Sequence, residues 1–147
     1  MQLKTHLKID QNLSGKPVEL REGYAVVVLE TKENMVADEK GLIHGGFIFS
    51  LADYCAMLAV NEPTVVLASA KVDFRKPVVL GDVLKAEGRV VKSEGKKRWV
   101  EVKVFRNLDL VFEGEFLCVI PEKHVLSLFE NPSSGRPLHP APRPLNQ

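Results

Sequence analysis

The chain has 147 residues, of which 45% are hydrophobic, and its 20 Lys and Arg residues nearly balance its 19 Asp and Glu residues. This length fits one domain with a substantial core, and the small net charge argues against nucleic acid or an anionic membrane as a partner. The start, MQLKTHLKID, lacks the apolar core of a signal peptide, and no stretch reaches the ~18 consecutive apolar residues of a membrane span. We therefore expect a single cytoplasmic domain at residues 1–130, with its core at about residues 24–120.

The sulfur and imidazole side chains do not indicate a metal site. The cysteines, Cys55 and Cys118, lie far apart in apolar surroundings and lack the CxxC spacing of zinc and redox sites, so we expect buried, reduced thiols. The histidines share no ligand spacing; they are His6, His44, His124 and His139. No metal is therefore expected.

A strand and then a helix are the first elements predicted along the chain. Period-two alternation predicts a strand at residues 24–31 (YAVVVLET). From Phe47 to Val60 apolar residues occupy every face, which is typical of a helix enclosed by protein. Asn61 favours the left-handed conformation that ends helices and Pro63 cannot continue one, so the predicted helix stops there.

Four strands are predicted after the helix, at residues 65–74, 83–91, 99–106 and 111–120. Short turns, SEGKKR and NLDL, join the last three into an antiparallel meander. A run of antiparallel strands after one helix predicts an α+β fold with the sheet curled around that helix. The proline-rich segment 131–147 (NPSSGRPLHPAPRPLNQ) is predicted to be an extended or mobile tail.

Three sequence features now carry a family resemblance: GLIHGGFIFSLAD, a strand that ends in VDFRKPVVLGD, and the hairpin GKKRWVEV. Together they resemble the hotdog-fold acyl-CoA thioesterases, specifically the phenylacetyl-CoA thioesterase-like branch, over roughly residues 24–120. The resemblance implies a hotdog fold, in which a long helix is wrapped by an antiparallel sheet. It also implies hydrolysis of acyl-CoA without a cofactor, in a homodimer or homotetramer whose active sites cross the dimer interface.

The two glycines at the predicted helix start, Gly45 and Gly46, suit the binding of an oxyanion. The first amides of a helix lack intrahelical acceptors and lie at the positive end of its dipole, so either glycine amide is a candidate donor to a thioester carbonyl. The missing side chains let the substrate approach. The alternative is that the glycines only allow a tight turn before a packed helix.

Asp53 is a carboxylate within an otherwise apolar helix. Burial of an ionised carboxylate is costly unless it is paired or faces a cleft. Burial also raises the pKa of a carboxyl group and makes it a better base, so we interpret Asp53 as catalytic, either activating water or attacking the thioester directly. The alternative is an acid at a solvent edge or in a structural hydrogen bond.

Helix geometry separates Gly45 from Asp53. At about 1.5 Å per residue they lie ~12 Å apart along the helix axis, too far to reach one carbonyl group together. Two antiparallel copies of the chain related by a two-fold axis solve this, because Gly45 of one then faces Asp53 of the other. The sequence therefore predicts two equivalent composite sites in a dimer.

Three further polar residues are candidates for the site. His44 precedes the helix and contacts either the thioester or the loop backbone. Ser69 lies on the next strand, where some members of the resembled family place a hydroxyl that orients water or substrate. Asp38 stands where the family often has Asn, which places its water-positioning role in doubt. A second carboxylate near Asp53 would repel it unless Asp38 is protonated or paired, for example with Lys40. Either Asp38 points away or the site differs, and Asn34 is an alternative only if the loop alignment shifts.

The phosphates of coenzyme A suggest roles for two groups of basic residues. Arg75 and Lys76 end one predicted strand, and Lys97 and Arg98 with their neighbour Lys96 begin another. If both groups meet at the pocket mouth, they bind the phosphates. The alternative for the second group is a solvated hairpin.

Aromatic and apolar residues of the helix are candidates for an acyl pocket or for plain core; they are Phe47, Phe49, Tyr54 and Met57. Two other function classes stay open. The first is a non-catalytic hotdog module that senses an acyl-CoA. The second is a hotdog enoyl-CoA hydratase or dehydratase, which the position of the acid in mid-helix fits less well.

Overall fold

The computed structural model describes residues 1–131 and 136–137. Its elements in chain order are α1 (Gln11–Ser14), β1 (Lys16–Arg21), β2 (Tyr24–Glu30), the short 3₁₀ helix η1 (Glu33–Met35), α2 (Gly45–Val60), β3 (Val66–Phe74), β4 (Val83–Glu94), β5 (Lys97–Arg106), β6 (Asp109–Val119), α3 (Val125–Leu128), β7 (Glu130–Asn131) and β8 (Arg136–Pro137). The predicted helix and all five predicted strands are present, with small differences at their ends. The parts of the proline-rich tail at 132–135 and 138–147 lie outside the described residues.

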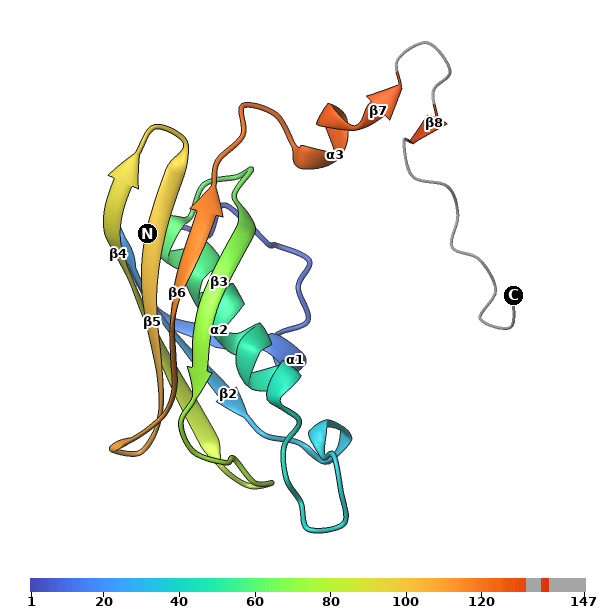
Figure 1. Ribbon diagram of the computed structural model, residues 1–147, viewed down its shortest axis with the longest axis vertical. Coiled ribbons are helices and arrows are strands. Elements are labelled where there is room, and N and C mark those ends of the chain that lie inside the picture. The colour runs from blue at the N-terminus through green and yellow to red at the C-terminus, as the bar shows by residue number, and fades with distance from the viewer. Residues whose placement is uncertain (132–135, 138–147) are drawn as a thin grey trace.

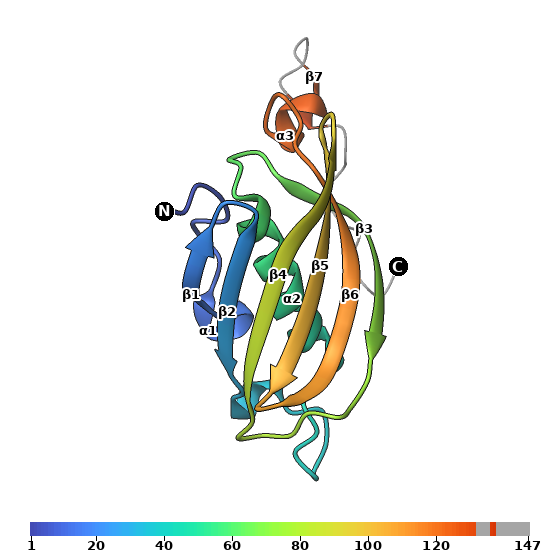
Figure 2. The same cartoon turned by 90° about the vertical axis from the view of Figure 1, so that its left-hand side faces the viewer.

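Six strands form one antiparallel sheet in the order β1-β2-β4-β5-β6-β3. The sheet curls around the long helix α2, which lies against its inner face (Figures 1 and 2). This is the hotdog arrangement, so the predicted fold class is confirmed. The strands β1 and β3 form the two edges of the sheet.

The helix α2 is buried because its residues are apolar on every face. Nine of its residues, from Ile48 to Ala59, are buried. At one point the helix nearly touches the sheet, because a Cβ on Gly88 of β4 would lie 3.0 Å from Cys55 Sγ. Only glycine fits there without a shift, so Gly88 allows the close packing of α2 on β4. Both cysteines are free and buried, as predicted.

The C-terminus of α2 is capped by Asn61, as predicted. Asn61 is left-handed, with φ 50°, and its amide donates to the Met57 carbonyl at 2.8 Å. Its side chain also accepts from the Lys4 amide at 2.8 Å and donates to the Gln2 carbonyl at 2.9 Å. One residue therefore ends the helix and ties down the N-terminal segment.

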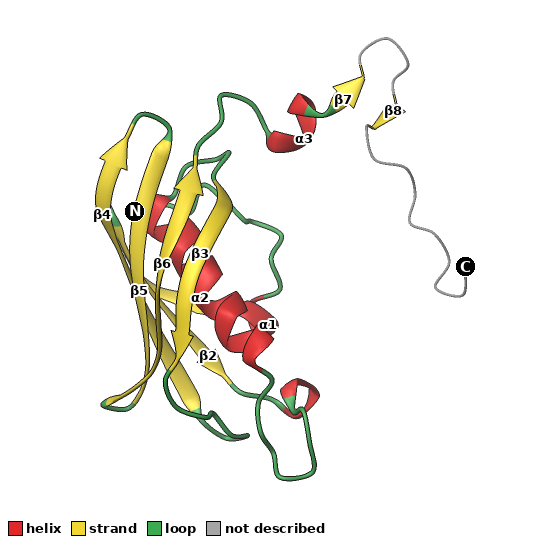
Figure 3. Ribbon diagram, viewed as in Figure 1, coloured by secondary structure: helices red, strands yellow, loops and turns green. Residues whose placement is uncertain are grey.

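The N-terminal segment contains two elements that the sequence analysis missed, α1 and β1. The segment passes along the side of α2 away from the sheet (Figure 3), and the hydroxyls of Ser14 and Ser50 lie 2.7 Å apart. The strand β1 lacks a clear alternation and contains Pro17 beside a bulge. Proline is tolerated at such an edge position, where its missing N–H breaks no ladder.

The other edge strand, β3, is open to solvent along its middle. It pairs with β6 alone, and residues 68–71 are exposed on both faces of the strand. An edge with unpaired backbone groups is a template for pairing with another chain. Among the described residues, the fold thus leaves one edge of this long strand unpaired, next to the central helix.

Candidate active site

The start of α2 presents unpaired amide donors. His44 is the N-cap, with φ −60° and ψ 132°, and its own amide donates to the Met35 carbonyl at 3.0 Å. The amides of Gly45 and Gly46 donate to no acceptor among the described residues. Two N–H groups at the positive end of the α2 dipole are therefore available to a ligand.

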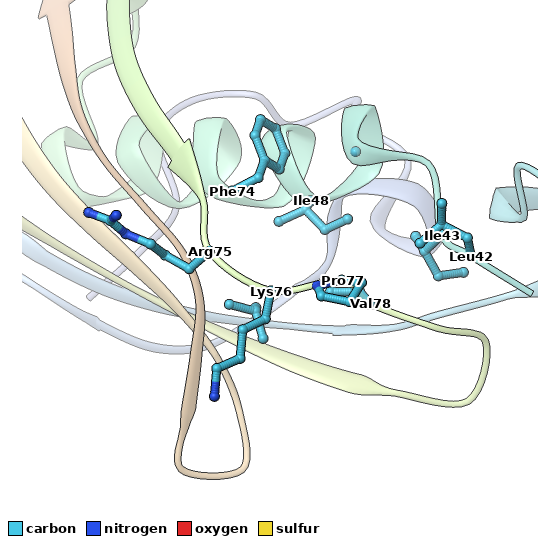
Figure 4. A pocket seen from close by; sticks show the side chains of 10 residues that line it. Leu42, Ile43, Ile48, Phe74, Arg75, Lys76, Pro77 and Val78 are labelled. Carbon is cyan, nitrogen blue, oxygen red and sulfur yellow. The ribbon is translucent and has the colours of Figure 1, made fainter.

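A pocket of about 230 Å³ adjoins Gly45, the first of these two residues. It is lined by Leu42, Ile43, Gly45, Ile48, Phe74, Arg75, Lys76, Pro77, Val78 and Val111. In Figure 4 the Phe74 ring and Ile48 lie next to the helix start, while the charged ends of Arg75 and Lys76 extend away from it. The part of the pocket beside Gly45 is therefore apolar.

Asp53 lies half-buried in the middle of α2. Its Oδ1 atom is buried and has no hydrogen-bond partner among the described residues. Burial raises the pKa of Asp53 to about 6. Such an unsatisfied buried oxygen is costly, and carboxyl groups with a raised pKa are concentrated at functional sites, so Asp53 is a candidate site residue.

The surroundings of Asp53 are the inner face of β6. Phe49, one turn earlier on the same side of the helix, packs on Phe116 with ring centroids 5.6 Å apart. Burial, and secondly the charge of Asp53, raise the pKa of the Cys118 thiol to about 12. Asp53 therefore faces Phe116 and Cys118, close to the open β3 edge and ~12 Å along the helix axis from Gly45.

His44 is exposed at the helix start. Its ring meets the Phe47 ring edge-on, with centroids 6.2 Å apart. A Cβ on Gly46 would lie 3.1 Å from the His44 ring, so the imidazole lies against this glycine. The ring is thus placed beside the candidate oxyanion donors, and its chemical role stays a prediction.

Asp38 lies in the exposed loop before the helix. Its carboxylate accepts hydrogen bonds from the amides of Lys40 at 2.9 Å and Leu42 at 3.2 Å. Asp38 thus interacts with the backbone amide of Lys40, whereas pairing with the Lys40 ammonium group was expected. Asp38 shapes the loop that leads to Gly45, and its role toward substrate is left as a prediction. Asn34 lies in η1 and is also exposed.

Ser69 does not lie near Asp53 within one chain. It pairs with Leu117, whereas Phe116 and Cys118 point toward α2. Directly paired residues share one face of a sheet and neighbours along a strand alternate, so Ser69 faces away from the helix. The expected role in orienting water is not supported by this position.

The two basic groups lie at opposite ends of the sheet, which corrects the expectation that they meet. Arg75 follows β3 near the helix start, whereas Lys97 pairs with Val119, which in turn pairs with Val66 at the other end of β3. The strand β3 spans nine residues, so its whole length separates the groups.

Four of these five basic side chains also have a partner within the chain. Arg75 binds Glu113 at 3.0 Å and Lys76 binds Asp109 at 3.0 Å. Arg98 donates to the carbonyls of Gly95 and Lys97, and Lys96 is 3.4 Å from Glu122. All of these ion pairs are solvent-exposed, so they compete only weakly with a phosphate.

The acyl-pocket candidates separate into two kinds. Tyr54 and Met57 are fully buried core residues, so they do not line the pocket at Gly45. Phe47 and Phe49 are only partly buried. The sequence analysis missed Phe74, whose ring lies against Gly45 and meets Phe112 edge-on at 5.0 Å. The available signal in the sequence was an aromatic residue at the end of a predicted strand.

Among the residues that the structure describes, no group of His, Cys, Asp and Glu side chains is arranged to hold a metal ion. None of the helices in the same ranges is long and apolar enough to cross a membrane. The cytoplasmic location stays a prediction.

Residues 40–111 match the family model described as "Thioesterase superfamily". A methylthioribose-1-phosphate isomerase from Aquifex aeolicus is 59% identical over 119 residues, which are 81% of this chain and 26% of that protein. The transcription factor FapR from Caldanaerobacter subterraneus is 29% identical over 76% of this chain and 56% of its own length. The chain thus spans about a quarter and about half of these two curated relatives.

Solved structures resemble most of the chain. An uncharacterized protein from Pyrococcus horikoshii is 56% identical with a TM-score of 0.85, covering 86% of this chain and 97% of its own. A mutant of the phenylacetic acid degradation protein PaaI from Thermus thermophilus is 28% identical with a TM-score of 0.69. The match covers 74% of this chain and 95% of that chain.

Proposed function

Because the chain belongs to the thioesterase superfamily, we propose that it is a hydrolase that cleaves an acyl-CoA thioester to the free acid and CoA. One observation carries this proposal: the half-buried carboxylate of Asp53 has an oxygen without a partner among the described residues and a pKa of about 6. A base with this pKa is largely ionised at neutral pH and still accepts a proton readily. Most buried structural acids are hydrogen-bonded, so this oxygen without a partner within the described residues favours a functional role.

The Gly45 amide, or that of Gly46, donates to the thioester oxygen and stabilises the negative charge that develops there. Asp53 either takes a proton from the attacking water or attacks the carbonyl carbon itself. The first route forms a tetrahedral intermediate that expels the CoA thiolate. The second forms a mixed anhydride that water then cleaves. Both routes end with the C–S bond broken and a proton on the thiol.

The site is proposed to form across a homodimer, since one helix does not bring Gly45 and Asp53 to one carbonyl. The open edge of β3 supports antiparallel pairing of two copies along this strand. Such pairing brings the helix start of one copy toward the middle of the helix in the other. Two identical sites result, and further association of dimers gives the tetramer that the resemblance implies.

The same pairing supports a common site for the CoA phosphates. Arg75 and Lys76 lie at one end of β3 and Lys97 and Arg98 lie near the other. Antiparallel pairing therefore brings Arg75 of one copy toward the hairpin of its partner. We propose that the two groups bind CoA phosphates together at the mouth of each composite pocket.

Free-thiol release from short, medium, long and aryl acyl-CoAs tests the function, with Asp53→Ala beside the wild type. We expect hydrolysis of at least one ester and a loss of about 100-fold or more in the variant. Light scattering and circular dichroism must show that the variant keeps its fold and its oligomeric state. An inactive wild type, or an active Asp53→Ala variant, would refute the proposed mechanism.

A second candidate is a non-catalytic module that binds an acyl-CoA. The similarity to the transcription factor FapR favours this candidate, because that relative is named for regulation and not for hydrolysis. Calorimetric titration separates the two. Tight binding of an acyl-CoA that stays intact for hours supports the binding module, whereas turnover supports the hydrolase.

A further inference from the structure

The least exposed ion pair in the described part of the chain joins Arg106 to Asp82. The Arg106 guanidinium lies 3.0 Å from the Asp82 carboxylate, and the two side chains are only 24% and 18% exposed. The same nitrogen, Nη1, donates to the Pro77 carbonyl at 2.8 Å. Nη2 lies 3.7 Å from Asp109. Arg106, at the end of β5, thus holds both ends of the loop 77–82 that connects β3 to β4.

Asp82 organises that loop from within. Its carboxylate also accepts from the Val79 amide at 3.0 Å. Thr31 provides a second hold, because its hydroxyl donates to the Asp82 carbonyl at 2.7 Å and accepts from the Gly81 amide at 2.9 Å. The loop is therefore fastened by side chains from β5 and from the end of β2.

The loop in turn holds the segment that leads into α2. The Ile43 amide donates to the Val78 carbonyl at 2.8 Å, and the Leu80 amide donates to the Gly41 carbonyl at 2.8 Å. Pro77, Val78 and Ile43 all line the pocket beside Gly45 (Figure 4). A continuous series of hydrogen bonds thus runs from Arg106 through the loop to the residues directly before the helix start.

We infer that Arg106 is a positioning residue, which sets the place of the Gly45 amide and of the pocket wall without touching substrate. The inference rests on the proposed function, because the pocket at Gly45 is taken as the thioester site. Removing Arg106 leaves the Pro77 carbonyl without its donor and the partly buried Asp82 carboxylate without its ion-pair partner, with the Val79 amide as the remaining donor to this carboxylate, so the loop shifts or loosens. A small displacement of an oxyanion donor has a large kinetic effect, because the donor must meet the oxygen within a few tenths of an ångström.

The test compares Arg106→Ala and Arg106→Lys with Arg89→Gln. Arg89 is a suitable control because its guanidinium lies on the Tyr24 ring, away from the pocket. In Arg106→Ala we expect kcat to fall about 10- to 100-fold with a much smaller change in KM. Arg106→Lys keeps the charge and should retain part of the rate, and the control should behave as the wild type.

Rescue by free guanidinium separates positioning from mere destabilisation. The alanine variant leaves space for the ion, so ~20 mM guanidinium, far below denaturing concentrations, should restore part of kcat. A variant that is only less stable would gain no activity from this addition, because so low a concentration barely changes its free energy of unfolding. An unchanged kcat in Arg106→Ala, or a loss without rescue by either guanidinium or lysine, overturns the inference.

Hydrogen exchange of residues 41–46 provides a readout that does not depend on catalysis. We expect faster exchange in Arg106→Ala than in Arg89→Gln, since the loop no longer holds this segment. If the wild type hydrolyses no thioester, the proposed function fails while exchange still decides the structural role of Arg106. Equal exchange in the two variants shows that Arg106 does not position the helix start.

Discussion

The Phe74 ring lies so close to Gly45 that a Cβ on this glycine would stand 3.1 Å from ring atom Cε1. This separation is tighter than ordinary van der Waals contact, so a side chain at the first residue of α2 displaces the ring. Because Gly45 has no side chain, the Phe74 ring packs against it and the Gly45 amide stays accessible beside the ring. Phe74 is itself 56% exposed, which leaves room for the ring to move aside.

Gly45→Pro should abolish most activity while keeping the helix. Proline suits the first helical position and has no N–H, and the extended backbone of His44 is compatible with a following proline. Loss of one oxyanion donor should lower kcat by about 100- to 1,000-fold. Gly45→Ala is the matched control, since it adds the same Cβ and retains the N–H. Gly46→Pro tests the neighbouring amide, and whichever proline has the larger effect identifies the donor.

The pH dependence of kcat/KM should report Asp53. Because burial raises its pKa to about 6, the carboxylate that acts as base or nucleophile is lost as the pH falls through this value. We expect kcat/KM to be constant above about pH 7 and to fall tenfold per pH unit well below pH 6. The pH profiles of kcat/KM for an activated and an unactivated thioester should have their midpoints at the same pH. A rate that stays flat down to pH 4.5 would exclude an acid with this pKa.

Asp53→Asn should be more stable than the wild type at neutral pH. Burial raises the folded-state pKa of Asp53 to about 6, above the usual range of an aspartate, so the native state binds the proton more tightly and stability falls as the pH rises from about 4 to about 6. Asparagine does not titrate, and we expect its free energy of unfolding to be about 1–3 kcal/mol higher at pH 7.5. The advantage should vanish near pH 4, and thermal melts at both pH values would measure it. A destabilised variant at pH 7.5 would mean that the carboxylate is favourably paired in the assembly.

Mixing two inactive variants should restore activity if the site is composite. In a heterodimer of Asp53→Ala and Gly45→Pro, one of the two sites has both residues intact. Random exchange of subunits should therefore recover about a quarter of the wild-type rate. Each variant incubated alone is the control. Full activity of a form shown by light scattering to be monomeric would contradict a shared site.

Neutralising Lys96, Lys97 and Arg98 together should raise KM for acyl-CoA with little change in kcat. These residues are proposed to bind phosphates, and their exposed ion pairs within the chain contribute little. The triple variant should hydrolyse a short thioester that lacks the CoA nucleotide with the same kcat and KM as the wild type. Equal losses on both substrates would show that the hairpin does not bind phosphate.

Local patterns in the sequence were sufficient to predict the central helix, its end at Asn61 and five of the six strands of the sheet. These features depend on the alternation of apolar residues and on the conformations that Asn and Pro favour, which involve only nearby residues. The apolar context likewise marked Asp53 as an unusual acid. The separation of Gly45 and Asp53 followed from helix geometry alone.

Only the tertiary structure decided which side chains meet. The bulge between Leu67 and Ser69 sets the face on which Ser69 lies, and the pairing of β5 with β6 places Lys97 far from Arg75. The ion pair between Arg106 and Asp82 joins residues that are distant in sequence. The segment of β1 becomes a strand through its pairing with β2. Register and pairing depend on contacts across the whole domain, and a shift of one residue turns a side chain to the opposite face. For that physical reason the sequence by itself determined the helix, most of the strands and the unusual acid Asp53. The long-range pairing of the strands determined which side chains line the pocket at the helix start.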